Sequence, residues 1–541
     1  MKRLAAALAL VVTAGLGTAH AEPKAAPVGP LSGGDDLAAA LALEDRLGAI
    51  SLHEGHAVPV DLDAAGVPAK TGGWGDSGLW TGVYEGGEAL RYAVARDHAA
   101  RSTGQEKQFW RDQKDAALAR LRSTLAAEHR DIVIAQDWTG HLKVPPTVNT
   151  GTDPKGEKHL ADFGGGVIPG EAGMIMRACT TASAYPLGVD PPTQDDANPI
   201  NNNSNRLFQI RWTHGDGKLY NCETSPSRDT YAGLTFGLLT AYDMLGNDAP
   251  DLRDQIRADL VAMGNFLFKY GWNYPRPHGY VSANHDFDGF ISPLFVYVPM
   301  ARLNLTNAVV HVLADGDDPV ERAKWQGIWA EELATQGPVL AASMEVDSVQ
   351  PNDGYYKFNL HHLTGFNLMR TTAEPARSLV KQAISVMDKT TGDDLNAHFE
   401  AITYAMTGEP GRLDAAVQHL REWRVYKARV ERGEASSVTC STVTCVRKDQ
   451  YGVVTPAGEI DWFPGTSGDK RAALPLPVVD RAPSDFIWQR EPTVVNGKSE
   501  PTTHREPAID YLTPYWMLRY ETEVAQPALS PLPPWPGPAH V

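Results

Sequence analysis

The feature that most limits how this chain can fold is a set of glycines, spaced as on one helix face, within a helical sequence pattern. From Gly75 to Asp97, apolar residues recur at the spacing of one helix face, and Gly86 and Gly87 fill the missing step of that stripe. The pattern predicts an amphipathic helix. A glycine inside a helix costs about 1 kcal/mol relative to alanine. We therefore expect another backbone or a bound ligand to approach this helix closely.

A second segment, Ser227 to Asp248, repeats the pattern. Two glycines and an aspartate occur 151 positions after their counterparts in the first segment, so that Gly82, Gly86 and Asp97 match Gly233, Gly237 and Asp248. The shared spacing indicates an internal repeat.

The remainder of the chain alternates between two kinds of helical segment. Weaker relatives of the glycine-containing segments occur near residues 171, 293, 359, 396 and 514, with longer and more charged helical patterns between them. Inner helices of a closed ring are packed on all sides, whereas outer helices face water on one side. The alternation therefore predicts an all-α fold, an (α/α)6-type toroid of helical hairpins over residues 71–525.

The N-terminus has the layout of a secretory signal peptide. Lys2 and Arg3 precede an apolar run, and Ala19-His20-Ala21 forms a small-x-small cleavage site. The run is too short to span a bilayer. We expect residues 1–21 to be removed and the protein to be periplasmic or secreted. Residues 22–70 form an N-terminal segment, and 526–541 form a proline-rich, extended tail.

Two long segments break the helical pattern, near residues 181–227 and 433–507. Loops of this length in a compact domain are usually covers or binding loops, and we expect both at one mouth of the ring. In an exported protein the cysteines favour disulfides, most simply Cys179 with Cys222 and Cys440 with Cys445, although four cysteines allow three pairings.

Charge and motifs exclude several function classes. The formal net charge is −17, and it becomes −19 without Lys2 and Arg3. This balance disfavours nucleic acids and anionic membranes as partners, while a local basic cleft stays open. The C-x4-C spacing with no histidine nearby is poor for zinc, and "LHEGH" is one residue short of H-E-x-x-H. We expect neither a metal nor a cofactor. The oligomeric state stays open.

Three aspartates stand at or just before the expected inner helices. Asp76, Asp229 and Asp510 could each be a helix cap or a loop acid. Two carboxyl groups facing each other across a pocket would instead serve as the acid and base of glycoside hydrolysis. The hypothesis places Asp76 and Asp229 as catalytic acids, with Asp510 binding substrate.

The stretch "YVSANHDFDGFISP" concentrates side chains able to exchange protons. His285 and Asp286 are candidate catalytic residues, and Asn284 and Asp288 are candidate substrate ligands. A turn rich in Asn, Asp and Gly explains the same composition. Calcium could use the two aspartates, but the acidic loop of an EF-hand is missing.

The stretch "FNLHHLTGFN" holds adjacent histidines beside Asn359. Neighbouring helical residues point about 100° apart, so His361 or His362 could enter the lumen while the other packs against a neighbouring helix. A histidine with a tyrosine and an amide is also suited to β-elimination on uronates. Aromatic residues at inner positions are candidate sugar-stacking surfaces or simply core, notably Trp80, Tyr84, Tyr231 and Tyr511.

The strings "WGDSGLWTGVYEGGEALRYA", "SRDTYAGLTFGLLTAYDML" and "IDYLTPYWMLRY" resemble the (α/α) toroids of secreted carbohydrate-active proteins. This six-hairpin group includes unsaturated uronyl hydrolases, other glycosidases and several polysaccharide lyases. The pattern of alternating helices is similar over most of the chain, but few residues are identical. No catalytic residue is therefore carried over. The fold alone does not choose a function. With the paired carboxylates, we expect an exported glycoside hydrolase that acts on a carbohydrate or similar polar substrate. A polysaccharide lyase and a non-catalytic toroid that binds a glycan or a protein are the alternatives.

Overall fold

The chain is mostly helical. The structure is a computed structural model that describes residues 31, 34–137, 157–159, 170–181, 200–202, 207–223, 226–272, 280–282, 297–347, 355–438, 445–448, 454–456, 470–472, 474–495 and 499–525. The expected signal peptide, the C-terminal tail and the candidates Asn284, His285, Asp286 and Asp288 lie outside the described residues.

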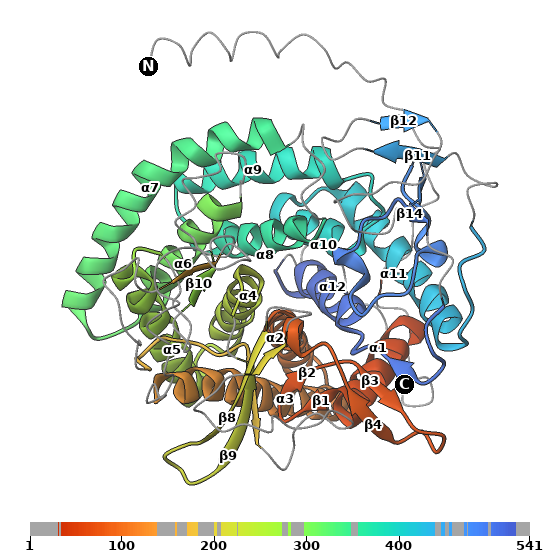
Figure 1. Cartoon of the computed structure of the whole chain (residues 1–541), viewed down its shortest axis with the longest axis horizontal. Coiled ribbons are helices and arrows are strands. Elements are labelled where there is room, and N and C mark those ends of the chain that lie inside the picture. Colours follow the sequence, from red (N-terminus) through yellow and green to blue (C-terminus); the bar gives the residue numbers. More distant parts are fainter. Residues whose placement is uncertain are drawn as a thin grey trace.

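The α-helices follow one another around the molecule (Figure 1). Their bounds are α1 Gly34–Arg46, α2 Ser77–Arg101, α3 Gly104–Gln136, α4 Arg228–Leu245, α5 Pro250–Lys269, α6 Tyr297–Ala314, α7 Pro319–Asp347, α8 Tyr356–Thr371, α9 Ala376–Thr391, α10 Ala397–Thr407, α11 Pro410–Glu431 and α12 Ile509–Tyr520. The expected helices from Gly75 to Asp97 and from Ser227 to Asp248 correspond to α2 and α4.

The even-numbered helices contact one another in a closed circuit. Helix α2 packs on α4, α4 on α6, α6 on α8, α8 on α10, α10 on α12, and α12 again on α2. Each of these helices also packs against a chain neighbour, α2 on α3, α4 on α5, α6 on α7, α8 on α9 and α10 on α11, while α12 contacts α1. Most of the side chains of α2, α4, α8, α10 and α12 are buried, as helices packed on all sides require.

The glycines of α2 and α4 allow these two helices to touch backbone to backbone. A Cβ atom added at Gly82 would stand 2.1 Å from the carbonyl oxygen of Gly233, and one added at Gly233 would stand 2.4 Å from that of Leu79. On the next turn, a Cβ at Gly86 would meet the ring of Phe236 at 2.3 Å. The expected close approach is therefore a helix–helix contact, and the matched glycines of the repeat face each other across it.

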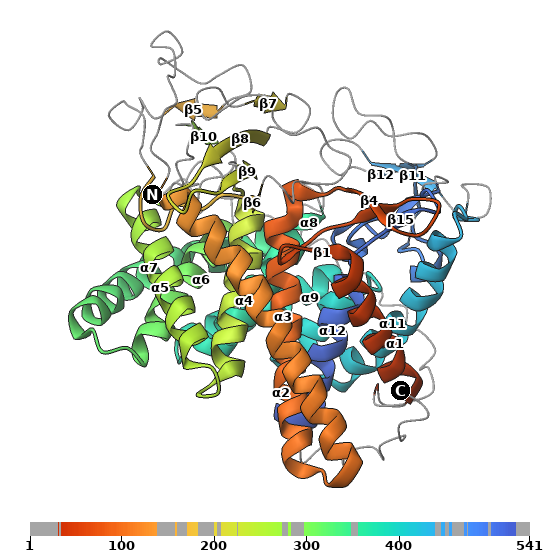
Figure 2. The same ribbon diagram turned by 90° about the horizontal axis from the view of Figure 1, so that it is seen from below.

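Short strands gather at one end of the helices (Figure 2). Their bounds are β1 Leu52–His53, β2 His56–Ala57, β3 Val60–Leu62, β4 Pro68–Thr71, β5 Glu157–His159, β6 Ala178–Thr181, β7 Ile200–Asn202, β8 Leu207–Thr213, β9 Leu219–Glu223, β10 Tyr280–Ser282, β11 Cys445–Lys448, β12 Val454–Pro456, β13 Lys470–Ala472, β14 Val494–Val495 and β15 His504–Arg505. All the described pairings are antiparallel, in sheets ordered β6-β9-β8-β7, β12-β11-β13-β14, β15-β3-β4, β1-β2 and β10-β5.

The two insertions were expected as long loops, and the structure corrects this. Near 181–227 the chain forms β7, β8 and β9, and near 433–507 it forms β11 to β15. The backbone groups of these strands thereby find partners in sheet ladders. The expected disulfide between Cys179 and Cys222 is present and joins directly opposite residues of β6 and β9. Cys440 lies outside the described residues, so its expected bond with Cys445 stays a prediction.

Helix α1 packs into the same body as the other helices, although the expected boundary at residue 70 separates it. Asp36 of α1 accepts hydrogen bonds from Arg421 at 2.8 Å and from Arg424 at 3.0 Å, both on α11. Glu44 accepts one from Trp516 of α12 at 2.8 Å. In the part of the chain that the structure describes, no helix combines the length and apolarity needed to cross a membrane.

Candidate functional site

Asp76 stands at the start of α2, where a cap would stand, but its side chain makes no capping hydrogen bond. A 3-10 turn, Trp74–Asp76, leads into the helix, and the preceding Gly73 adopts a left-handed conformation with φ of 64°. An aspartate at this position normally accepts hydrogen bonds from the first turn of its helix. Capping therefore does not account for the carboxylate of Asp76.

Asp229 lies in the first turn of α4 and is not the cap either. Ser227 caps this helix, and it forms a capping box with Thr230. The backbone groups that a cap must satisfy are thus served by other side chains. Both aspartates of the expected pair have carboxylates that the helix starts do not require.

The two carboxylates interact electrostatically. Burial and the charge of Asp76 raise the pKa of Asp229 to about 6, although Arg177 and Arg228 act to lower it. Burial also raises the pKa of Asp76, against the lowering by Arg177 and Arg490. Like charges close together cannot both ionise without cost, so one carboxyl of such a pair keeps its proton to higher pH. The expectation that Asp76 and Asp229 come together is consistent with this coupling.

Arg177 acts on both carboxylates, and the sequence did not single it out. Its backbone N–H donates to the carbonyl of Glu223 at 2.7 Å, next to the β6–β9 disulfide. Its Nη1 donates to the carbonyl of Gly75, directly before Asp76. The position of Cys179, two residues further on, was the one signal in the sequence that this stretch is held in place.

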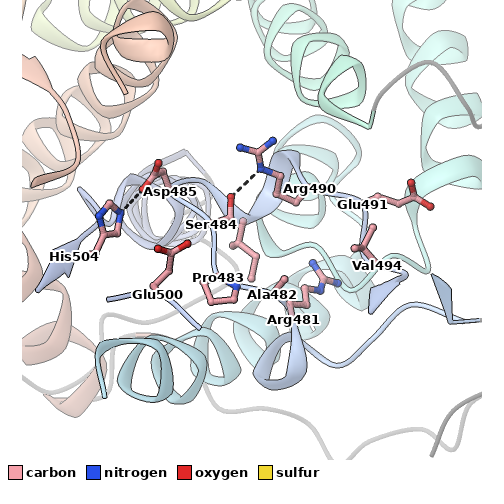
Figure 3. Close-up of a pocket in the computed structure, with 11 residues that line it drawn as sticks. Arg481, Ala482, Pro483, Ser484, Asp485, Arg490, Glu491, Val494, Glu500 and His504 are labelled. Atoms are coloured by element: carbon pink, nitrogen blue, oxygen red, sulfur yellow. Dashed lines mark hydrogen bonds and ion pairs between the residues drawn. The ribbon is translucent and has the colours of Figure 1, made fainter. Parts of the chain in front are cut away.

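A cavity of about 400 Å³ lies among the residues that precede α12 (Figure 3). Residues from the segment before α12 line it, namely Arg481, Ala482, Pro483, Ser484, Asp485, Ile487, Arg490, Glu491, Val494, Glu500 and His504. Two of them, Arg490 and Asp485, interact electrostatically with Asp76. A cavity of this volume is in the range of small-molecule sites. We call it the Arg481 cavity.

His504 lies between two carboxylates on one side of the Arg481 cavity. Its Nε2 is 2.6 Å from Asp485, and its Nδ1 is 2.9 Å from Asp61 of β3. Burial lowers the pKa of His504, but the two carboxylates raise it to about 9 overall. The imidazolium form, which donates from both nitrogens, therefore neutralises part of the negative charge of Asp485 at neutral pH.

The adjacent histidines of α8 face different neighbours, as their spacing predicts. His362 donates from Nδ1 to the carbonyl of Phe358 at 2.7 Å, and its ring stacks on Phe399 of α10 with centroids 4.0 Å apart. Burial lowers its pKa to about 4. His361 interacts electrostatically with Arg228 at the start of α4, and burial holds its pKa well below the usual value. Of the two, His361 is the one near the Asp229 end of the helices.

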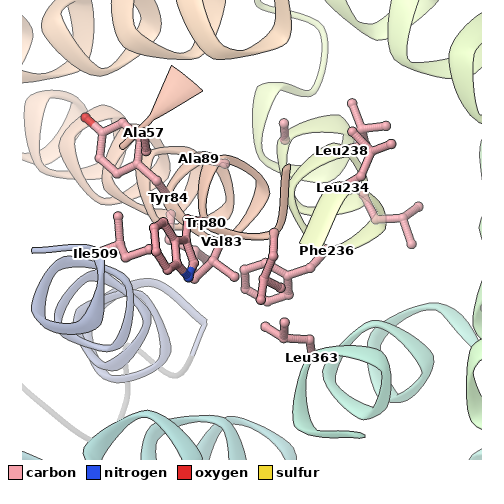
Figure 4. Close-up of a cluster of buried hydrophobic side chains, with 14 of the residues drawn as sticks. Ala57, Trp80, Val83, Tyr84, Ala89, Leu234, Phe236, Leu238, Leu363 and Ile509 are labelled. Carbon is pink, nitrogen blue, oxygen red and sulfur yellow. The ribbon is translucent and has the colours of Figure 1, made fainter. Parts of the chain in front are cut away.

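Several expected substrate ligands lie in the core (Figure 4). Trp80 lies in this cluster on the side of α2 that faces Ile509 of α12, and Tyr84 donates from its hydroxyl to Glu44 at 3.1 Å. These contacts account for both side chains structurally. Tyr231 belongs to the same buried cluster. Among the described residues, the indole N–H of Trp80 has no hydrogen-bond partner.

Asp510 and Tyr511 lie on α12 and do not line the Arg481 cavity themselves, but the carboxylate of Asp510 accepts a hydrogen bond from the backbone of Ile487, which does. Asp510 accepts from the indole N–H of Trp423 at 2.8 Å, and burial raises its pKa to about 7. Tyr511 packs with Tyr515, their ring centroids 5.7 Å apart. Asn359, in the first turn of α8, is fully buried, and its amide atoms have no hydrogen-bond partner in the described parts of the chain.

Among the described residues, no group of three or more His, Cys, Asp or Glu side chains is placed so that it could hold a metal ion. In comparisons with protein-family models, with curated proteins and with solved structures, the chain matches none.

Proposed function

We propose that the helices form a six-hairpin (α/α) toroid with a binding site at the mouth where the strands gather. The closed circuit of contacts among the even-numbered helices supports this architecture, as does the packing of each of them on a chain neighbour. The starts of α2 and α4 lie at that mouth, together with Arg177 and the Arg481 cavity. Positive helix ends favour acids and anions at such a position.

At this mouth we propose a glycoside hydrolase that uses Asp76 and Asp229. The observation that carries the proposal is the unequal environment of two coupled carboxyl groups, neither of which caps its helix. Asp229, with a pKa near 6, is suited to protonate the glycosidic oxygen. Asp76, flanked by Arg177 and Arg490, is suited to act as the ionised partner that activates water or attacks the anomeric carbon.

The charged surroundings of Asp76 support catalysis over mere binding. An apolar pocket, together with aspartates that only cap their helices, would favour a non-catalytic toroid. The Arg481 cavity is lined mainly by charged and polar side chains, and the carboxylate of Asp76 makes no capping bond. Groups with perturbed pKa values beside a cavity are typical of functional sites.

A polysaccharide lyase is the second candidate, and His361 is the observation that favours it. Burial lowers its pKa, so the ring is in the neutral form that a general base needs, although as a weaker base, and it lies near Arg228. In β-elimination a base removes the proton next to a carboxylate, and a cation stabilises the developing charge.

The test is a panel of purified polysaccharides incubated with the protein lacking residues 1–21. New reducing ends without ultraviolet absorbance indicate hydrolysis, whereas both signals together indicate elimination. We expect hydrolysis, and we expect Asp76→Asn and Asp229→Asn each to lower the rate by about 100-fold or more at unchanged melting temperature.

Asp97→Asn is the matched control, because Asp97 lies at the other end of α2 and pairs with Arg101 on the surface. It should leave the rate unchanged. Full activity in the Asp76 and Asp229 variants would remove both residues from the mechanism. Loss of activity in His361→Gln with absorbance in the wild type would establish the lyase instead.

A further inference from the structure

Arg481 is a buried cation, and only some of its hydrogen-bond donors have partners among the described residues. Its side chain lines the Arg481 cavity, yet the residue is only 4% exposed. Its Nε donates to the carbonyl of Leu476 at 3.2 Å, and its Nη2 donates to the carbonyl of Leu395 at 2.9 Å and to that of Asp394. Among the described residues, its Nη1 has no hydrogen-bond partner.

The nearby carboxylates do not form a direct ion pair with Arg481. Asp394 accepts a hydrogen bond from the hydroxyl of Tyr355 at 2.7 Å, and Glu400 is paired with His419 at 2.7 Å. Both act on Arg481 only through longer-range attraction, and burial lowers its pKa. A buried guanidinium with one unused donor and no close carboxylate is costly, and a bound anion would offset that cost.

Arg490 supplies a second cation to the same cavity (Figure 3). Its side chain is exposed, and its Nε donates to the hydroxyl of Ser484 at 2.9 Å. It also interacts electrostatically with Asp76. A group held by Arg490 would therefore lie next to the proposed catalytic pair.

We propose that the Arg481 cavity binds one anionic group of the substrate, a carboxylate, sulfate or phosphate, at the guanidinium of Arg490 and next to the buried charge of Arg481. The inference names a substrate class for the proposed hydrolase and rests on that proposal for its catalytic meaning. Glu491 and Glu500 also line the cavity, so a single anionic group fits better than a run of them.

The test is calorimetric titration of the protein lacking residues 1–21 with matched hexoses. Galactose, galacturonate, galactose 6-sulfate and galactose 6-phosphate differ only at C6. We expect at least one anionic sugar to bind about tenfold or more tighter than galactose, and the arms show which anion is preferred.

Two variants test the residues. Arg490→Gln removes an exposed cation and should leave folding unchanged while abolishing the preference for the anionic sugar. Arg481→Lys keeps the charge but loses the fork of donors, and should weaken the same preference. Arg122→Gln is the control, because this exposed arginine of α3 pairs with Asp251 and does not line the cavity.

Equal binding of all four sugars would overturn the inference, as would an anion preference that survives in both Arg490→Gln and Arg481→Lys. The proposed function fails separately. Hydrolysis of polysaccharides without anion preference would retain the hydrolase and reject this subsite. Anion preference that depends on Arg490, without any cleavage, would retain the subsite and reject the hydrolase.

Discussion

Gly82 of α2 and Gly233 of α4 lie so close that a Cβ atom at Gly82 would stand 2.1 Å from the carbonyl oxygen of Gly233. The contact continues toward the helix starts, where a Cβ at Gly78 would meet the side chain of Thr230 at 2.7 Å. Asp76 and Asp229 flank this end of the contact. Backbone packing thus brings together the two helix starts that carry the proposed catalytic pair.

Gly82→Ala should destabilise the protein by several kcal/mol, because neither backbone can move aside without disturbing its helix. Gly327→Ala is the matched control. Gly327 lies within α7, is exposed, and has no atom within 4 Å of a Cβ built there. There alanine should stabilise by up to about 1 kcal/mol. Denaturant unfolding measures both, and equal effects at the two sites would contradict the close contact.

Arg177→Gln should move the pH–rate profile to more alkaline pH. Arg177 lowers the pKa of both Asp76 and Asp229, so its removal raises both. We expect the acid and the alkaline limb of the pH–rate profile each to shift by about half a pH unit or more. Arg177→Lys should restore much of the profile. A lower rate with an unshifted profile would mean that Arg177 only supports the fold.

Two buried glutamates should show opposite pH dependence of stability. Burial raises the pKa of Glu85 to about 8, against hydrogen bonds from Thr124 and Glu128. The stability linked to its protonated form is complete below the unfolded pKa near 4.5 and is lost as pH rises through about 8. Relative to the wild type, Glu85→Gln should therefore gain stability between pH 5 and pH 9, on the order of 2 kcal/mol.

Glu523 is the counterpart. Burial acts to raise its pKa, but Arg519 and His98 lower it to about 2. Its stabilising contribution is complete above the unfolded pKa near 4.5 and is lost as pH falls through about 2. Glu523→Gln should destabilise at pH 7 by about 3 kcal/mol, since it leaves Arg519 buried without its partner. Thermal unfolding at a series of pH values measures both variants. A stability difference from the wild type that does not change with pH would refute the pKa shifts of Glu85 and Glu523.

Removal of the Cys179–Cys222 disulfide should lower both stability and activity. The bond closes a separation of 43 residues and joins β9 to β6, which begins directly after Arg177. The double alanine variant should lose roughly 2 to 4 kcal/mol of unfolding free energy. Dithiothreitol should reproduce the effect in the wild type. A variant with wild-type activity would show that Arg177 keeps its place without the bond.

The sequence was informative where periodicity and local chemistry decide the outcome. The stripes of α2 and α4, their close approach and the different surroundings of His361 and His362 followed from residue spacing. The Cys179–Cys222 bond is the simplest of the three pairings that four cysteines allow. The strands near 181–227 and 433–507 did not follow from residue spacing, because short strands form through pairing with distant partners. Cys179 opposite Cys222 is one such pair, and neither strand is stable alone.

For the site, the sequence by itself determined which carboxylates stand at helix starts, because polarity and helical register are local properties. Only the tertiary structure decided their surroundings. Arg177 and Arg490 reach Asp76 from segments far away in the chain, and Tyr84 and Asp510 find core partners in Glu44 and Trp423. Burial and the charges brought near a carboxyl group set its pKa, and both arise only when distant segments pack together.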